Sequence, residues 1–351
     1  MSQSKVSMNN LLIEGDNLKG LQYLLDNEYG GKVDLCYIDP PYNTGRTFKI
    51  NLDGDTRTIG YSDSDSVAYI DKFDGLDDYL GFIEDRLCLI YELLSDKGSF
   101  YLHCDYKYSH YLKVLCDSIF GFGNFKSDIS RIKCNPKNNV NGGYGSVKDC
   151  ILFYTKTDDY IWNTPYIPYT LGEVKEKFPK KDNGGCYQTV SLTAPGEVKD
   201  GVTGQKVWNG VELPKGRHWS RPPSELTRLD NDGLIEWSKN GNPRRKIYSH
   251  EVKGKRLQDV WYDFKDKPRP SYPTQKNRDL LDMIIRTSSN PNSIVLDCFM
   301  GSGTTLQCSY LNNRYWIGID NSSKAIGLFE KEYDSLDNTL YGNRKYVKIK
   351  L

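Results

Sequence analysis

The 351-residue sequence predicts an α/β fold with a doubly wound, mostly parallel sheet and an inserted irregular domain. Short apolar runs alternate with stretches of helical spacing in residues 1–155. This alternation stops in residues 156–276, which are rich in Pro, Gly, Lys and Trp, and resumes in residues 277–351. Strands that alternate with helices are typical of a sheet with helices on both faces.

The first part of the chain predicts strands and helices in turn. Residues 33–38 (VDLCYI) form an apolar run that ends at a Pro-rich turn, which predicts a buried strand. Residues 79–94 have apolar side chains at helical spacing, and Gly98 follows them. The next elements are a strand at 99–103, a helix at 111–120 and a buried strand at 150–154. The acidic stretch 52–78 predicts a mobile loop.

The last part repeats the same pattern after the insert. Apolar residues at 280–285 indicate a helix. The further elements are a strand at 294–296, a helix at 304–311, a strand at 315–319, a helix at 322–333 and a final edge strand at 346–351.

Charge is distributed unevenly, although the net charge is only +1. Residues 1–155 carry 16 basic and 22 acidic side chains, whereas residues 156–276 carry 22 basic and 16 acidic ones. This basic block also contains five of the six tryptophans, Trp162, Trp208, Trp219, Trp237 and Trp261. Basic and aromatic residues together suit phosphate contact and base stacking. A solvated surface over ordinary core tryptophans is the alternative that composition leaves open.

Several classes of protein are disfavoured by the sequence. It has no apolar run long enough to span a membrane and no secretory signal at its start. Nine scattered cysteines without a CxxC pair fit a reducing compartment. We therefore expect a cytoplasmic protein without a metal site.

A glycine-rich turn (DCFMGSGTT, 297–305) joins a predicted strand to a predicted helix. Gly301 and Gly303 allow the backbone to approach a ligand, and the helix start offers free N–H groups. Asp320 ends the next predicted strand, where an acidic residue can bind ribose hydroxyls. An adenosine-containing cofactor fits this pattern. The GxGxxG motif of dinucleotide-binding proteins is incomplete, because Leu306 replaces its third glycine. A plain tight turn is the alternative.

A second motif, Asp39-Pro40-Pro41-Tyr42, directly follows the first predicted strand. The two prolines fix the backbone, and ligands of open α/β sheets bind at this edge. A carboxylate and a rigid carbonyl can accept both hydrogens of an amino group, and an aromatic ring can stack on a planar base. A Pro-stiffened turn with a helix-capping Asp is the alternative.

Together, DPPY at 39–42 followed by GSGTT at 301–305 resembles the beta class of amino-group DNA methyltransferases, including type III modification subunits and solitary bacterial adenine-N6 enzymes. Further matches lie at residues 12–18, 86–87, 92–98, 111–115, 216–219, 236–244 and 272–276. The resemblance implies a seven-stranded, Rossmann-like methyltransferase sheet. It places a catalytic half at 1–155, a target-recognition domain at 156–270 and a cofactor-binding half at 271–351.

The resemblance also implies an activity: methyl transfer from S-adenosyl-L-methionine to the N6 amine of a flipped adenine in double-stranded DNA, without a metal. The setting would be a restriction–modification or solitary epigenetic system. A second copy of the chain and a cognate restriction endonuclease are the further partners that the class suggests.

Residue roles follow from the same resemblance. Asp39 and the Pro40 carbonyl would accept the hydrogens of the amine, and Tyr42 would stack on the base. The expected cofactor-binding residues are Asp16, Asp39, Thr274, Gln275, Asp297, Phe299, Gly301, Ser302, Gly303, Thr304 and Asp320. The expected DNA-binding residues are Arg217, Arg221, Arg244, Arg245, Lys246, Lys253 and Lys255. Lys276 is open between a site residue and an ordinary surface lysine.

Three other functions compete with this interpretation. Cytosine-N4 methylation is the nearest, although many enzymes of that kind have Ser in place of Asp39. A nicotinamide oxidoreductase would use the same type of sheet, but its glycine motif is broken here. A catalytically inactive DNA-binding protein is disfavoured because Asp39 and Tyr42 are both present.

Overall fold

The computed structural model describes residues 9–43, 46–50, 66–136, 143–198, 200–266, 276–340 and 345–351. The chain divides into two compact units. The smaller unit is Tyr166–Arg256, and the larger unit is formed by the chain on either side of it. Residues 156–165 and 257–266, which we expected in the insert, therefore belong to the larger unit.

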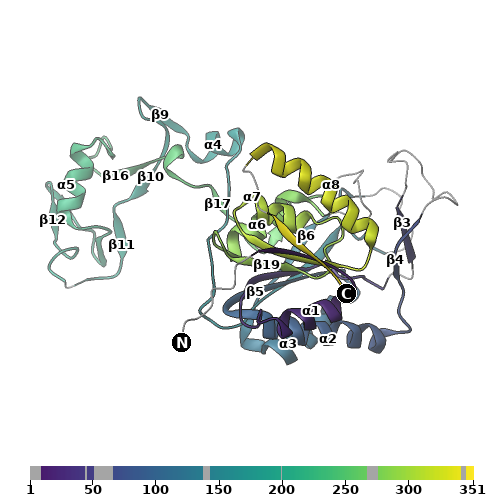
Figure 1. Cartoon of the computed structure of the whole chain (residues 1–351). Helices are drawn as coiled ribbons and strands as arrows, with labels where there is room; N and C mark the ends of the chain where they lie inside the picture. Colours follow the sequence, from purple (N-terminus) through teal and green to yellow (C-terminus); the bar gives the residue numbers. More distant parts are fainter. Residues whose placement is uncertain are drawn as a thin grey trace, which may run out of the picture. The chain divides into compact units, whose positions relative to one another are not determined.

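The larger unit contains a sheet of nine described strands in the order β18–β6–β7–β5–β2–β19–β20–β1–β21 (Figure 1). Their bounds are β1 (Asn10–Glu14), β2 (Val33–Ile38), β5 (Leu94–Cys104), β6 (Phe125–Ile132), β7 (Lys148–Thr155), β18 (Val260–Trp261), β19 (Ile294–Asp297), β20 (Tyr315–Asp320) and β21 (Tyr346–Lys350). Only β7 runs antiparallel to its neighbours within this sheet. The mostly parallel sheet is confirmed. The expected number of seven strands is too low, because β18 and β21 extend the sheet at its two edges.

Helices lie on both faces of this sheet, as a doubly wound fold requires (Figure 1). One face is covered by α1 (Asn17–Asp26), α2 (Leu76–Leu93) and α3 (Ser109–Phe120). The other is covered by α6 (Arg278–Ser288), α7 (Thr304–Leu311) and α8 (Ser323–Leu340). The helical spacing near residues 79–94 buries Ile83, Leu87 and Ile90 of α2, each contributing about 1.5–3 kcal/mol. No described helix combines the length and apolar character needed to cross a membrane.

Several elements of the larger unit were not predicted, namely β1, α1, β3, β6 and β18. The expected loop at 52–78 is also partly wrong, because β4 (Ser66–Asp71) pairs antiparallel with β3 (Arg46–Ile50) and α2 already begins at Leu76. Residues 52–65 of that stretch lie outside the described residues.

The described residues of the smaller unit form short strands and two α-helices. A four-stranded antiparallel sheet has the order β15–β16–β10–β9. Its strands are β9 (Lys180–Asp182), β10 (Gly185–Ser191), β15 (Ile235–Trp237) and β16 (Pro243–Tyr248). Three strand pairs accompany it: β8 (Tyr166–Ile167) with β17 (Lys255–Arg256), β11 (Thr193–Pro195) with β14 (Arg217–Trp219), and β12 (Val207–Trp208) with β13 (Val211–Glu212). The helices α4 (Leu171–Lys177) and α5 (Pro223–Asn231) were not expected.

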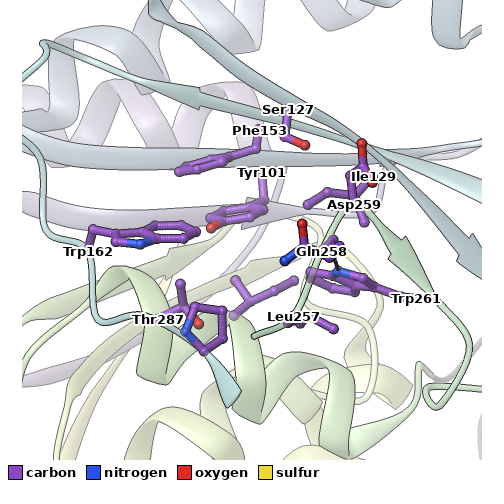
Figure 2. Close-up of a pocket in the computed structure, with 12 residues that line it drawn as sticks. Tyr101, Ser127, Ile129, Phe153, Trp162, Leu257, Gln258, Asp259, Trp261 and Thr287 are labelled. Carbon is purple, nitrogen blue, oxygen red and sulfur yellow. Dashed lines mark hydrogen bonds between the residues drawn. The ribbon is translucent and has the colours of Figure 1, made fainter. Parts of the chain in front are cut away.

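The five tryptophans of the basic block divide between the two units. Trp208 and Trp219 are buried in the core of the smaller unit, and Trp237 stacks on Trp208 with a ring-centroid distance of 5.7 Å. Trp162 and Trp261 belong to the larger unit, where they line a pocket on the α6 side of the sheet (Figure 2). Burial of Trp208, Trp219 and Trp261 favours the core-residue alternative over base stacking for these three.

Candidate active site

Four neighbouring parallel strands each end beside an acidic residue. Asp39 directly follows β2, Asp297 and Asp320 end β19 and β20, and Asp16 lies two positions beyond β1. These strands are adjacent in the order β2–β19–β20–β1. Since the carboxyl ends of parallel strands share one edge of the sheet, the four carboxylates form a row along that edge. This row, with the two motif turns that begin at Asp39 and Asp297, is the candidate site.

The Asp39 carboxylate has a partner on each oxygen. The Tyr42 hydroxyl donates to Oδ1, and the Lys276 ammonium lies 2.9 Å from Oδ2. Lys276 Nζ also donates to the Tyr42 hydroxyl at 3.2 Å. Burial and the nearby Asp39 charge raise the pKa of Tyr42 well above its usual range, so the phenol stays protonated. Asp39, Tyr42 and Lys276 therefore form one closed polar cluster.

The turn after β2 is also held in place by a hydrogen bond with the segment that precedes α2. Pro40 is buried, and Asn43 has a positive φ of 50°. The Asn43 side-chain oxygen accepts a hydrogen bond of 3.1 Å from the Phe73 backbone N–H. The segment before α2 thus fixes the end of the motif, while the prolines stiffen its middle.

A buried histidine lies behind Tyr42, with 6.4 Å between the two ring centroids. His103 Nδ1 is 2.8 Å from the Tyr37 hydroxyl, and its Nε2 is 3.3 Å from Asp149 Oδ2. Burial lowers the pKa of His103, and the nearby Lys276 charge lowers it further. The imidazole is thus a neutral hydrogen-bonding link between β2, β5 and β7.

Asp149 connects this histidine to two buried or partly buried cations. Lys133 Nζ lies 2.7 Å from its Oδ1, and an Arg131 nitrogen lies 3.5 Å from its Oδ2. Burial alone would raise the pKa of Asp149, but the hydrogen bond with His103, the nearby Lys276 charge and the hydrogen bond with Lys133 bring it below its usual value. Sequence reasoning missed this cluster, since β6, which carries Arg131, was not predicted. The one local signal was the charged Arg131 close to the apolar Ile129 and Ile132.

The carboxylates of Asp297 and Asp320 organise the glycine-rich turn. The Gly301 N–H donates to Asp320 Oδ2 and the Ser322 N–H to Oδ1, both at 2.9 Å. The Phe299 N–H donates to Asp297 Oδ1 at 3.0 Å. Burial raises the pKa of Asp297 to about 7 and that of Asp320 to about 6. Each carboxylate oxygen retains a second lone pair with which to accept a hydrogen bond.

Gly303 serves packing in this turn. Its φ is +72°, and a Cβ placed there would lie 2.2 Å from Cδ2 of the buried Phe329 in α8. The neighbouring Ser302 and Thr304 are also buried. At Gly303 the absent side chain makes room for Phe329 of α8, and the close approach of a ligand to these glycines stays a prediction.

Asp16, the remaining carboxylate of the row, is half exposed. It caps α1 by accepting from the Lys19 N–H at 3.1 Å and lies 3.6 Å from Arg86. Arg86 donates to the Asn17 side chain at 2.7 Å, and Asn17 donates to the Cys298 carbonyl at 3.0 Å. These bonds join the ends of β1 and β19. Thr274 and Gln275, by contrast, lie outside the described residues.

The expected DNA-binding residues mostly have partners within the smaller unit, which holds 17 basic and 11 acidic residues. Three of them pair with carboxylates: Arg221 with Glu225, Lys246 with Asp182 and Lys255 with Glu173. Arg217 and Arg244 donate to Thr193 and Thr189, Lys253 lies 5.8 Å from the Tyr166 ring centroid, and Arg245 is partly buried in β16. Much of the positive charge therefore stabilises the unit itself.

The described residues contain no group of three His, Cys, Asp or Glu side chains placed to bind a metal.

Comparison with known proteins identifies related chains. A family model for N6 and N4 methyltransferases, described as DNA methylase, matches residues 33–331. The type II methyltransferase M.EcaI of Enterobacter cloacae is 38% identical over 94% of this chain and 71% of its own length.

The StyLTI Mod subunit, a type III restriction-modification enzyme of Salmonella typhimurium, is 29% identical over 84% of this chain. The match covers 49% of that subunit, so the chain spans about half its length. The type II methyltransferase M.KpnI of Klebsiella pneumoniae is 27% identical over 91% of this chain and 80% of its own length.

Proposed function

The chain belongs to the DNA methylase family, and from this premise we propose that it methylates the N6 amine of adenine in double-stranded DNA with S-adenosylmethionine as donor. The observation that carries the proposal is the position of Asp39. It follows β2 directly and lies beside the Asp297 turn, which follows the adjacent strand β19.

The carboxylate row fits such a cofactor. S-adenosylmethionine supplies an electrophilic methyl group on a sulfonium, and it also carries an ammonium group and two ribose hydroxyls. Asp297 and Asp320 offer lone pairs for these donors, and Asp16 offers a half-exposed carboxylate at the same edge. Phe299 and Phe82, whose ring centroids are 6.1 Å apart, provide an apolar surface beside the turn. Negative charge beside a cationic ligand favours its binding.

Asp39 and Pro40 act on the target amine in this proposal. The amine is a weak nucleophile because its lone pair is delocalised into the ring. Asp39 and the Pro40 carbonyl accept its hydrogens, which directs the lone pair outwards and stabilises the positive charge that develops on nitrogen. Tyr42 stacks on the base. A paired base cannot reach this edge, so the base is flipped out of the duplex.

The smaller unit is our candidate for target recognition. It carries a net charge of +6, against −5 for the rest of the chain. Arg217, Arg244, Arg245 and Lys253 form no ion pair with a carboxylate in the described residues. These four are the strongest candidates for contacts with phosphates or base edges.

The adenine assignment rests on the acidic residue that opens the motif. The acidic Asp39 is the residue type that resembles the adenine enzymes at this position, whereas many cytosine-N4 enzymes have Ser there. The test is to express the chain in a host without DNA methylation and analyse its nucleosides. N6-methyladenine is the expected product. N4-methylcytosine alone would overturn the adenine assignment but keep the family activity, and an unmodified genome would contradict both. Long-read mapping of the same DNA would give the recognition sequence.

A further inference from the structure

Lys276 is the residue of the site that the proposed chemistry does not yet use. Its side chain is only 10% exposed, although a lysine is seldom buried without a partner. That partner is Asp39, at 2.9 Å from Oδ2. The ammonium therefore occupies the carboxylate that the target amine needs.

The position of Lys276 is fixed by helix α6. Asn277, the next residue, caps this helix by accepting from the Asp279 N–H at 2.7 Å. The Asn277 side chain also donates to the Lys265 carbonyl at 2.6 Å. Since α6 is packed into the core through Leu280, Ile284 and Ile285, the backbone at Lys276 has little freedom. Only its long side chain can withdraw.

Tyr42 occupies the other oxygen of the same carboxylate. Because the Tyr42 hydroxyl donates to Asp39 and accepts from Lys276, the Tyr42 ring is held within the cluster. Entry of a base that stacks on Tyr42 and donates to Asp39 must therefore break both contacts. Lys276 and Tyr42 together keep the amine site closed while it is empty.

On the basis of the proposed function, we propose that Lys276 is a positioning residue that stands in for the target amine. It compensates the Asp39 charge in the empty site and withdraws when the amine donates to the same oxygen. The amine must compete with an ammonium for one carboxylate. This competition lowers the affinity for a base that carries the amine, because only such a base must displace the ammonium from Asp39.

The test compares K276M and K276Q, which lack the cation, with K276R, which keeps it. Each binds two duplexes in the presence of S-adenosylhomocysteine: one with adenine at the mapped target and one with 2-aminopurine, which lacks the 6-amine. K276M and K276Q should increase the preference for adenine over 2-aminopurine about tenfold, the worth of one charge-assisted hydrogen bond. K276R should match the wild type.

An unchanged preference in K276M and K276Q would overturn the proposal. So would a loss of kcat of tenfold or more in both variants with an unchanged preference, since Lys276 would then act in the reaction itself. Equal melting temperatures exclude a folding defect. Methyl transfer by the wild-type protein to the adenine duplex is measured separately, and its absence would refute the proposed function rather than the role of Lys276.

Discussion

The substitution G303A tests whether the glycine-rich turn is shaped by packing against α8. An alanine at φ +72° costs about 1–2 kcal/mol in backbone strain. Its Cβ would also lie 2.2 Å from Cδ2 of Phe329. That ring cannot easily retreat, because it packs against Trp316 with a centroid distance of 5.3 Å. Overpacking a core of this kind costs about 1–3 kcal/mol. We therefore expect a loss of about 2–5 kcal/mol in the free energy of unfolding.

The matched control is G31A. Gly31 has a similar φ of +68°, but a Cβ there would meet nothing within 4 Å, so only the strain of about 1–2 kcal/mol applies. The difference between the two variants in the free energy of unfolding, measured in urea, isolates the contribution of the Phe329 contact. In an F329L background, G303A should cost less, since the obstructing ring is gone. Equal losses in G303A and G31A would refute the reasoning.

Three further predictions concern pH and salt. The Kd for S-adenosylmethionine should fall as the pH is raised from about 6 to about 8, because a cationic ligand favours the ionised forms of Asp297 and Asp320. Burial raises the pKa values of these two carboxyls to about 7 and about 6. Calorimetry in two buffers should detect the release of protons on binding, and a pH-independent Kd would contradict this prediction. In the empty protein, the folded state holds the protons of Asp297 and Asp320 more tightly than the unfolded chain does. The contribution of these two groups to the free energy of unfolding therefore declines as the pH rises from about 4 to about 7. The substitution D297N should weaken this decline, as measured by urea unfolding. DNA binding through Arg217, Arg244, Arg245 and Lys253 predicts a log–log salt slope of about −4, which is roughly a hundredfold loss of affinity between 50 and 200 mM salt. A salt-independent Kd measured by anisotropy would refute these residues as the DNA contact.

The alternation of strands and helices was predictable because it depends on local periodicity. The runs at 33–38 and 294–296 became the central strands β2 and β19, and their motif turns lie at one edge of the sheet. In contrast, β1 and α1 were missed, although β19 and α7 are shorter and were predicted. The helices α4 and α5 were missed because few of their side chains are buried: α4 buries none, and α5 buries Leu226 and Leu229.

Contacts between distant residues were not predictable. Lys276 binds Tyr42 across 234 positions, and the family match at 272–276 left the role of that lysine open. The buried link from His103 to Asp149 likewise depends on the pairing of β5 with β7. Charge counts also gave no indication that Lys255 is held by Glu173, 82 positions away. Composition identified the basic segment, but the fold decides which of its charges remain available.

Methyl transfer by D39A, measured with cofactor affinity on the same preparation, tests the central claim most directly. Asp39 is assigned to the target amine, so the variant should lose at least about 10²–10³-fold in the rate of labelled methyl transfer to DNA. Its Kd for S-adenosylmethionine should stay within about threefold of the wild-type value, since Asp297 and Asp320 remain. Transfer at the wild-type rate with normal cofactor binding would contradict the role of Asp39, and with it the active site described at this edge of the sheet.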